Sequence, residues 1–179
     1  MIQRYNGIEP TLDPTAWVHP NATVIGDVVL GPYVSVWPSA VLRGDCGPIR
    51  VGAYSNIQDG TIVHTTQDLS ETHIGERVTV GHSSVIHGCR IDDDCLVGMN
   101  STILDNVELG AGTLVAAGSL VSVAMRSGGG GYADASAAAR GFATGDAAVR
   151  RRGDLPLGIQ LSRLHRDGHG WRRRYRLRT

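Results

Sequence analysis

A branched aliphatic residue returns at every sixth position along most of this chain. A six-residue period repeated this often predicts a parallel β-helix, in which three short strands and three corners make one coil of about 18 residues. The low aromatic content, 5% with a single Phe, suits the narrow aliphatic core of a solenoid. The periodic residues are Val18, Val24, Leu30, Val36 and Leu42, then Val51, Ile57 and Val63, then Ile74, Val80 and Ile86, then Ile91, Val97, Ile103, Leu109, Val115 and Val121.

Three interruptions break the period. Leu42 and Val51 are nine positions apart, and Ile86 and Ile91 are five apart. The longest interruption adds a polar loop, residues 65–73, at one corner. If the extra residues are looped out of the coil, the count of faces continues unchanged.

Charge and composition divide the chain into three parts. Residues 1–17 form a lead-in, where Pro10 and Pro14 are expected to prevent regular ladder pairing. Residues 18–125 form the β-helix. Residues 1–125 hold 5 Arg and 13 Asp or Glu, hence −8, and residues 126–179 hold 12 Arg and 4 Asp, hence +8. We expect 126–179 to be an irregular, disordered basic tail rich in Gly, Ala and Arg; a shifted reading frame is the other interpretation.

Several classes of protein are not favoured. No run of about 18 apolar residues predicts a membrane span, and residues 1–10 do not resemble a secretory signal. The basic tail has little aromatic interleaving, so nucleic-acid binding is not indicated. Three cysteines without a C-x-x-C pair argue against a disulfide framework or a thiolate zinc site, and a cytoplasmic location is expected: Cys46, Cys89 and Cys95.

Counting the repeats places three histidines at corners of the prism. Three aliphatic residues share one face in successive coils: Leu42, Val63 and Ile86. The residues that follow them form one outward column: Arg43, His64 and His87. Val80 lies over Ile57 by the same count. A second column on the neighbouring face therefore contains Asp59 and His82, with Gln58 beside it.

The two columns predict a metal site between subunits. His64 and His87 are close enough to bind one ion, whereas His82 lies around the prism edge. A three-fold trimer brings the first column of one subunit to the second column of the next, and this contact closes into a ring. Three neutral imidazoles with an open fourth position are the ligand set of a catalytic zinc ion. Arg43 is expected to bind Asp59 across this interface; an exposed Arg43–Asp45 pair is the alternative.

These segments resemble the gamma-class carbonic anhydrases and their close bacterial relatives over residues 10–121. The resemblance implies a left-handed β-helix and a homotrimer with a metal at each subunit interface. The segments that carry it are VLRGDCGPIRVG, NIQDGTIVHT, VTVGHSSVIHG and CLVGMNSTILDNVELGAGTLVAAGSLV.

The resemblance also implies an activity and the residues that perform it. His64 and His87 of one subunit and His82 of its neighbour are implied to bind Zn²⁺, with Fe²⁺ or Co²⁺ as alternative ions. The implied reaction is hydration of CO₂ to bicarbonate by a carbonate dehydratase, a lyase. Further polar site residues are implied, with Gln58 orienting hydroxide or substrate and Asp59 fixing Arg43: Arg43, Asp45, Gln58 and Asp59.

Two features of the chain differ from the family pattern. The glutamates that export protons in the family correspond to Cys46 and Gln67 here, and three nearby residues are candidates to replace them: Asp68, Glu71 and His73. The helix that follows the family's solenoid has no counterpart after Val121. The alternative functions are therefore a related metalloprotein that hydrolyses a thioester or only holds the ion, an acyltransferase with a histidine base, and a non-catalytic scaffold.

Overall fold

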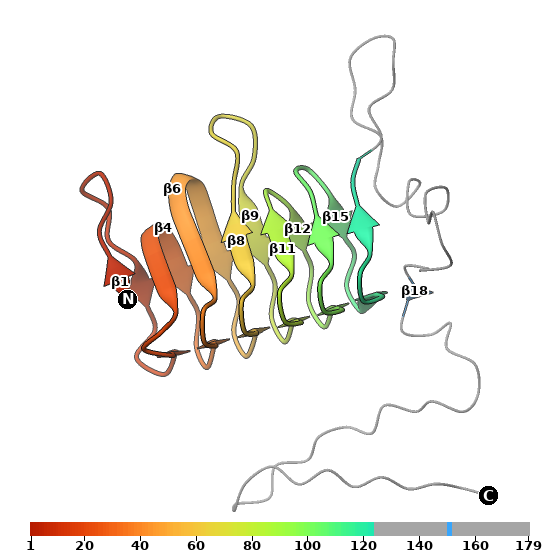
Figure 1. The fold of residues 1–179 in the computed structure, drawn as a ribbon, viewed down its shortest axis with the longest axis horizontal. Coiled ribbons are helices and arrows are strands. Elements are labelled where there is room, and N and C mark those ends of the chain that lie inside the picture. Colours follow the sequence, from red (N-terminus) through yellow and green to blue (C-terminus); the bar gives the residue numbers. More distant parts are fainter. Residues whose placement is uncertain (124–149, 152–179) are drawn as a thin grey trace, which may run out of the picture.

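The computed structural model describes residues 1–123 and 150–151. Its short strands stack into the predicted left-handed parallel β-helix (Figure 1). Within these residues no helix is long and apolar enough to cross a membrane. The strands are β1 (Ile2–Gln3), β2 (Thr11–Leu12), β3 (Trp17–Val18), β4 (Thr23–Leu30), β5 (Ser35–Val36), β6 (Val41–Val51), β7 (Asn56–Ile57), β8 (Ile62–His64), β9 (Thr72–Ile74), β10 (Thr79–Val80), β11 (Val85–His87), β12 (Arg90–Ile91), β13 (Leu96–Val97), β14 (Thr102–Ile103), β15 (Glu108–Leu109), β16 (Thr113–Val115), β17 (Leu120–Val121) and β18 (Arg150–Arg151).

The aliphatic residues of the period line three faces of the prism, and their side chains fill its core. The first face stacks Val24, Leu42, Val63, Ile86, Ile103 and Val121 in register. The second face stacks Leu12, Leu30, Val51, Ile74, Ile91 and Leu109. The third face stacks Val18, Val36, Ile57, Val80, Val97 and Val115. The register confirms the count that placed the histidines.

Hydroxyl side chains at the corners bond to the backbone of the neighbouring coil. Ser55 Oγ donates to the Gly75 carbonyl at 2.7 Å, and Thr61 Oγ1 donates to the Gly81 carbonyl at 3.0 Å. Both side chains are completely buried. A buried hydroxyl needs such a partner because an unpaired one costs about 1–3 kcal/mol. Small polar residues therefore fit these corners as well as small apolar ones do.

Two long strands continue around the corner between the first and second faces. β4 and β6 pair on both faces, with an irregularity between Gly26 and Val28. Gly26 has a φ of +72°, and a Cβ there would collide with the Gly44 carbonyl. The extra residues between Leu42 and Val51 thus extend β6 at this corner, and the insertion after Val63 forms a protruding loop, residues 65–71, between β8 and β9 (Figure 1).

Strand pairing extends into the lead-in, contrary to the expectation from its prolines. β1 pairs with the first half of β4, and β2 pairs with the second half. Pro10 and Pro14 lie just outside these two-residue strands, where their missing N–H groups interrupt no ladder bond. The domain boundaries at residues 17/18 and 125/126 stay predictions.

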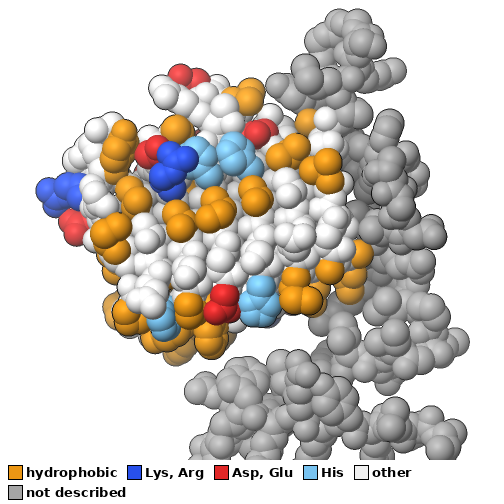
Figure 2. All heavy atoms as spheres, in the orientation of Figure 1, with side chains coloured by type: hydrophobic (Ala, Val, Ile, Leu, Met, Phe, Trp, Pro, Cys, Tyr) orange, Lys and Arg blue, Asp and Glu red, His pale blue; other side chains and the backbone are white. Residues whose placement is uncertain are grey.

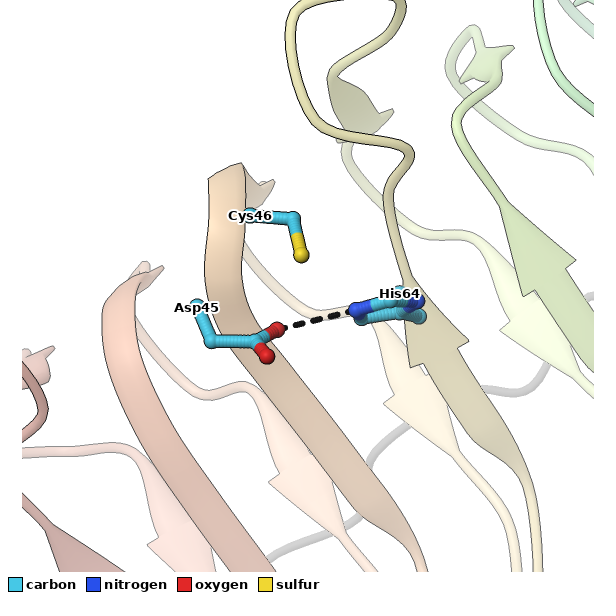
Figure 3. A group of neighbouring side chains, drawn as sticks. All are labelled: Asp45, Cys46 and His64. Carbon is cyan, nitrogen blue, oxygen red and sulfur yellow. Dashed lines mark hydrogen bonds and ion pairs between the residues drawn. The ribbon is translucent and has the colours of Figure 1, made fainter.

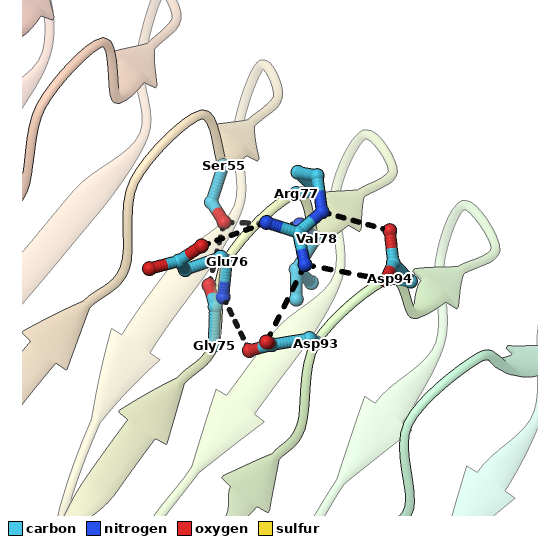
Figure 4. A network of polar contacts seen from close by, with 7 residues as sticks. All are labelled: Ser55, Gly75, Glu76, Arg77, Val78, Asp93 and Asp94. Atoms are coloured by element: carbon cyan, nitrogen blue, oxygen red, sulfur yellow. Dashed lines mark hydrogen bonds and ion pairs between the residues drawn. The ribbon is translucent and has the colours of Figure 1, made fainter.

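Arg77 joins several acidic residues at the corner between the second and third faces (Figure 4). It binds Asp94 through Nε at 3.0 Å, Glu76 at 2.7 Å and Asp93 at 3.4 Å. The hydrogen bond to Asp94 is the largest cause that raises the pKa of Arg77 above its ordinary value. All these side chains are well exposed, so the ion pairs add little to stability.

The predicted disordered tail lies outside the described residues except for β18. This strand pairs antiparallel with β16, with Arg151 opposite Thr113 and Arg150 opposite Leu114.

Candidate metal centre

His64 and His87 occupy the ends of two stacked strands on the first face, β8 and β11. They are paired in register, because each directly follows an inward aliphatic residue of its coil. Their rings are 5.1 Å apart and nearly perpendicular, and Nδ1 of His64 lies 3.1 Å from Nε2 of His87. The side chains are 14% and 25% exposed, so a small ion or molecule can reach these nitrogens from solvent.

A carboxylate contacts the other nitrogen of each ring. Asp45 Oδ1 lies 2.9 Å from Nε2 of His64. Both carboxylate oxygens of Asp105 lie 3.1 Å from Nδ1 of His87. A metal-ligating histidine commonly donates its second N–H to a carboxylate in this way, which fixes the tautomer and orients the ring. The two nitrogens that face each other are therefore the ones available to an ion.

The geometry of these nitrogens fits one tetrahedral ion. Two imidazoles bound at about 2.0–2.1 Å to the same zinc hold their nitrogens about 3.3 Å apart. The separation between His64 and His87 is 3.1 Å, close to that value. A catalytic zinc site uses three protein ligands, and the pair brings together two of the three imidazoles predicted here.

His82 lies at a different edge of the prism. It follows β10 on the third face, and its Nδ1 lies 2.9 Å from Asp59 Oδ2, as expected from the stacking of Ile57 and Val80. Its side chain is 49% exposed. Histidine side chains appear at separate places on the face drawn in Figure 2, two of them side by side. One chain thus brings two of the three predicted ligands together.

The other predicted site residues divide between these two edges. Arg43 binds Asp45, which also contacts His64, so the first edge carries an arginine–carboxylate–histidine chain. Gln58 and Asp59 directly follow β7 at the second edge. Within the chain Arg43 therefore forms its ion pair with Asp45, and Asp59 contacts His82.

Cys46 adds a thiol to the first edge. Ligand atoms of Asp45, Cys46 and His64 lie within 4.8 Å of one another, and all three residues are partly buried. Figure 3 shows the carboxylate of Asp45 and the sulfur of Cys46 extending toward the His64 ring. These residues are a candidate metal-binding group within one chain, and they involve a cysteine that composition alone did not assign to a metal.

Both carboxylates beside the histidines have a pKa below the ordinary value. Burial raises the pKa of Asp45, but hydrogen bonding to His64 and the charge and hydrogen bond of Arg43 outweigh burial. Burial also raises the pKa of Asp105, and hydrogen bonds from Ser70, Thr66 and His87 together with the His87 charge outweigh it. Both groups therefore remain ionised acceptors at neutral pH.

Asp105 is the polar partner that the sequence analysis did not identify. Its signal was present in the repeat: Ile103 stacks on Ile86, so the residues after Ile103 lie one coil above His87. Asp105, two residues after Ile103, contacts His87, as Asp45, three residues after Leu42, contacts His64.

The candidate replacements for the proton-exporting glutamates lie in or next to the protruding loop. His73 pairs in register with Arg50 and Arg90 on the second face, and its Nε2 lies 3.0 Å from Glu71. Gln67 and Asp68 are exposed in the loop. The Glu71–His73 pair therefore lies at the start of the second face, whereas His64 lies at the end of the first.

Comparison with known proteins identifies relatives of this solenoid. The bacterial transferase hexapeptide (six repeats) model matches residues 71–103 and 88–122. The carnitine operon protein CaiE of Escherichia coli strain K12 is 47% identical over 122 residues, which cover 68% of this chain and 62% of that protein. The mitochondrial gamma carbonic anhydrase 2 of Arabidopsis thaliana is 50% identical over 117 residues, covering 63% of this chain and 42% of that protein. The chain thus spans less than two thirds of these curated relatives.

Solved structures agree with this relationship. A hexapeptide transferase family protein from Anaplasma phagocytophilum is 43% identical with a TM-score of 0.62, and the match covers 68% of this chain and 70% of that one. A putative acetyltransferase from Bacillus cereus is 38% identical with a TM-score of 0.65 over the same shares. The chain is related to gamma carbonic anhydrase and CaiE, and it belongs to the hexapeptide-repeat family.

Proposed function

We propose that this chain forms a homotrimer that binds zinc at each subunit interface and hydrates CO₂ to bicarbonate. The ligands are His64 and His87 of one subunit and His82 of the next. One observation carries the proposal: each of the three imidazoles has one nitrogen against a carboxylate and the other available for an ion. Two of the available nitrogens already lie 3.1 Å apart.

The surface between the two edges supports a three-fold assembly. The chain runs from His82 across the first face to His87, so both edges border this face. Its outward positions form a stripe in register, and four of these five are apolar: Val41, Ile62, Val85, Thr102 and Leu120. Ile62 is 38% exposed and Leu120 is 64% exposed. If three copies of the chain pack their first faces around a common three-fold axis, this stripe is buried. Each His64–His87 pair then lies next to His82 of a neighbouring subunit.

The residues around the ion have distinct tasks in this proposal. Zinc held by His64, His87 and the neighbouring His82 would supply a nucleophile for CO₂ at neutral pH by acidifying a water molecule, the chemistry for which carbonic anhydrase is the standard example. Asp45, Asp59 and Asp105 keep the three imidazoles in the tautomer that leaves a lone pair for the ion. Gln58, beside the His82 edge, can orient the substrate with its amide. Arg43 holds Asp45 within the chain and is exposed enough, at 44%, to contact the neighbouring subunit as well. Fe²⁺ or Co²⁺ would suit the same ligands.

Stopped-flow CO₂ hydration by zinc-loaded and iron-loaded protein tests the reaction. We expect acceleration that is lost in His64→Ala and kept in His19→Ala, whose histidine follows β3 along the same edge as His82 but lies three coils before it. A fully loaded trimer that is no faster than buffer would refute CO₂ hydration.

An acyltransferase is the second candidate, because one solved relative is described as a putative acetyltransferase at 38% identity. This reaction needs a single histidine base and a bound acyl-CoA rather than three imidazoles. Tight binding of acetyl-CoA with unchanged affinity in His64→Ala would favour it. Loss of zinc in the same variant, without any acetyl-CoA binding by the wild type, favours the metal-dependent reaction.

A further inference from the structure

We infer that Asp105, held in place by Ser70 of the protruding loop, is a positioning residue that keeps the proton of His87 on Nδ1 and leaves Nε2 for the ion. This inference rests on the proposed function in one respect, since it takes His87 to be a metal ligand. It adds a residue outside the predicted site and gives the 65–71 loop a role in assembling it.

A continuous line of hydrogen bonds joins the loop to the imidazole. The backbone N–H of Thr66 donates to Ser70 Oγ at 3.0 Å, and Ser70 Oγ donates to Asp105 Oδ1 at 2.5 Å. Both Asp105 oxygens are then 3.1 Å from Nδ1 of His87. These hydrogen bonds link three segments of the chain: the loop that holds Thr66 and Ser70, the corner that holds Asp105, and the end of the strand that holds His87.

Gly88 makes room for this arrangement directly beside His87. Its φ is +57°, and a Cβ there would collide with both Ser70 Oγ and Asp105 Oδ1. The Gly88 N–H donates to Thr72 Oγ1 at 3.0 Å, and the Thr72 hydroxyl donates to the His64 carbonyl at 2.7 Å. Thr72, at the end of the loop, therefore connects the backbone of His64 to that of Gly88, the residue after His87.

The chemistry of the groups determines where the proton lies. A neutral imidazole carries one N–H, and an ionised carboxylate can only accept hydrogen bonds. Contact with Asp105 therefore places the proton on Nδ1 of His87. The lone pair is left on Nε2, the nitrogen that faces His64 at 3.1 Å.

Asp105→Asn should reverse this tautomer. Ser70 would keep its hydroxyl proton directed at the amide oxygen in the Oδ1 position, so the amide NH₂ would take the Oδ2 position and face Nδ1 of His87 as a donor, in competition with that oxygen. The imidazole would then carry its proton on Nε2, directed at the position of the ion. In the double variant Asp105→Asn with Ser70→Ala, the amide can rotate and accept from Nδ1–H again.

Nitrogen-15 NMR of histidine in the metal-free protein, at a pH where the rings are neutral, measures the tautomer directly. We expect Nδ1–H in the wild type, Nε2–H in Asp105→Asn and a return to Nδ1–H in the double variant. Zinc affinity by chelator competition should fall about 10- to 100-fold in Asp105→Asn and recover partly in the double variant. Asp92→Asn, which removes the same charge beside Arg90, is the matched control and should change neither quantity.

The outcomes separate this inference from the proposed function. An Asp105→Asn protein that keeps Nδ1–H and wild-type zinc affinity would overturn the role of Asp105. A His87→Ala protein with wild-type zinc affinity would instead refute the proposed centre. Equal loss in Asp105→Asn and in the double variant would overturn the part assigned to Ser70.

Discussion

His64 and His87 are neighbours in space because they follow equivalent residues of consecutive coils. Val63 and Ile86 are paired in register, and the next residues place Nδ1 of one ring 3.1 Å from Nε2 of the other. They are 23 positions apart in sequence, and the loop between them leaves the coil and returns to it. The repeat alone therefore brings two of the three proposed metal ligands together, and the third, His82, lies at another edge.

His82→Ala should abolish zinc binding while each β-helix stays folded. The side chain is half exposed and contacts Asp59, so its removal leaves no cavity in the core. We expect elemental analysis to show zinc falling from about one ion per chain to near zero, with an unchanged far-UV circular dichroism spectrum. His19→Ala is the control and should retain the ion. Full metal occupancy in His82→Ala would rule out the shared site.

Arg43→Ala should weaken the trimer. The guanidinium contacts Asp45, which also contacts His64, and it lies at the edge that would meet the neighbouring subunit in the proposed trimer. Light scattering should show the molar mass shifting from three chains toward one as the protein is diluted. Arg90→Ala, which removes an exposed pair with Asp92, should leave the mass unchanged. A trimer that survives dilution in Arg43→Ala as well as in the control would show that the arginine does not hold the interface.

Two glycine substitutions should differ sharply in their effect on folding. Gly26→Ala forces a side chain into a left-handed conformation and against the Gly44 carbonyl, whereas a Cβ at Gly110 meets no atom within 4 Å. We expect Gly26→Ala to reduce the free energy of unfolding by about 2 kcal/mol or more and Gly110→Ala to change it by less than about 0.5 kcal/mol. Urea denaturation measures both. Similar midpoints for the two variants would mean that the corner relaxes at no cost.

Thiol labelling should distinguish one cysteine from the other two. Cys46 is partly exposed, while Cys89 and Cys95 are buried. Burial raises the pKa of Cys89 to about 12 and raises that of Cys95 as well, so neither forms an appreciable amount of thiolate at pH 8. Mass spectrometry after iodoacetamide treatment at pH 8 should find only Cys46 modified in the native protein and all three in urea. Rapid native modification of Cys89 would show that the coil opens at this position.

The sequence was sufficient for the fold and for the stacking of the histidines, because a fixed period determines which residues lie above one another. Asp105 was not predicted, although it stands two residues after Ile103 and contacts His87 as Asp45, three residues after Leu42, contacts His64. Within the chain Arg43 binds Asp45, the alternative that the sequence offered, and its contact with Asp59 of a neighbouring subunit stays a prediction. Pairing of β1 and β2 with β4 was missed because Pro10 and Pro14 were expected to prevent it, whereas both prolines lie outside the two strands.

The most direct test of a zinc site shared between subunits is an experiment in which two variants, each lacking one part of the site, are mixed. His82→Ala keeps the His64–His87 pair, and His64→Ala keeps His82, so each variant alone should bind no zinc. If the ion is shared around a three-fold ring, trimers reassembled from an equal mixture should regain zinc at about a quarter of their interfaces, where an intact pair meets an intact His82. Zinc in the mixture that does not exceed the sum of the separate variants would contradict a site built from two subunits.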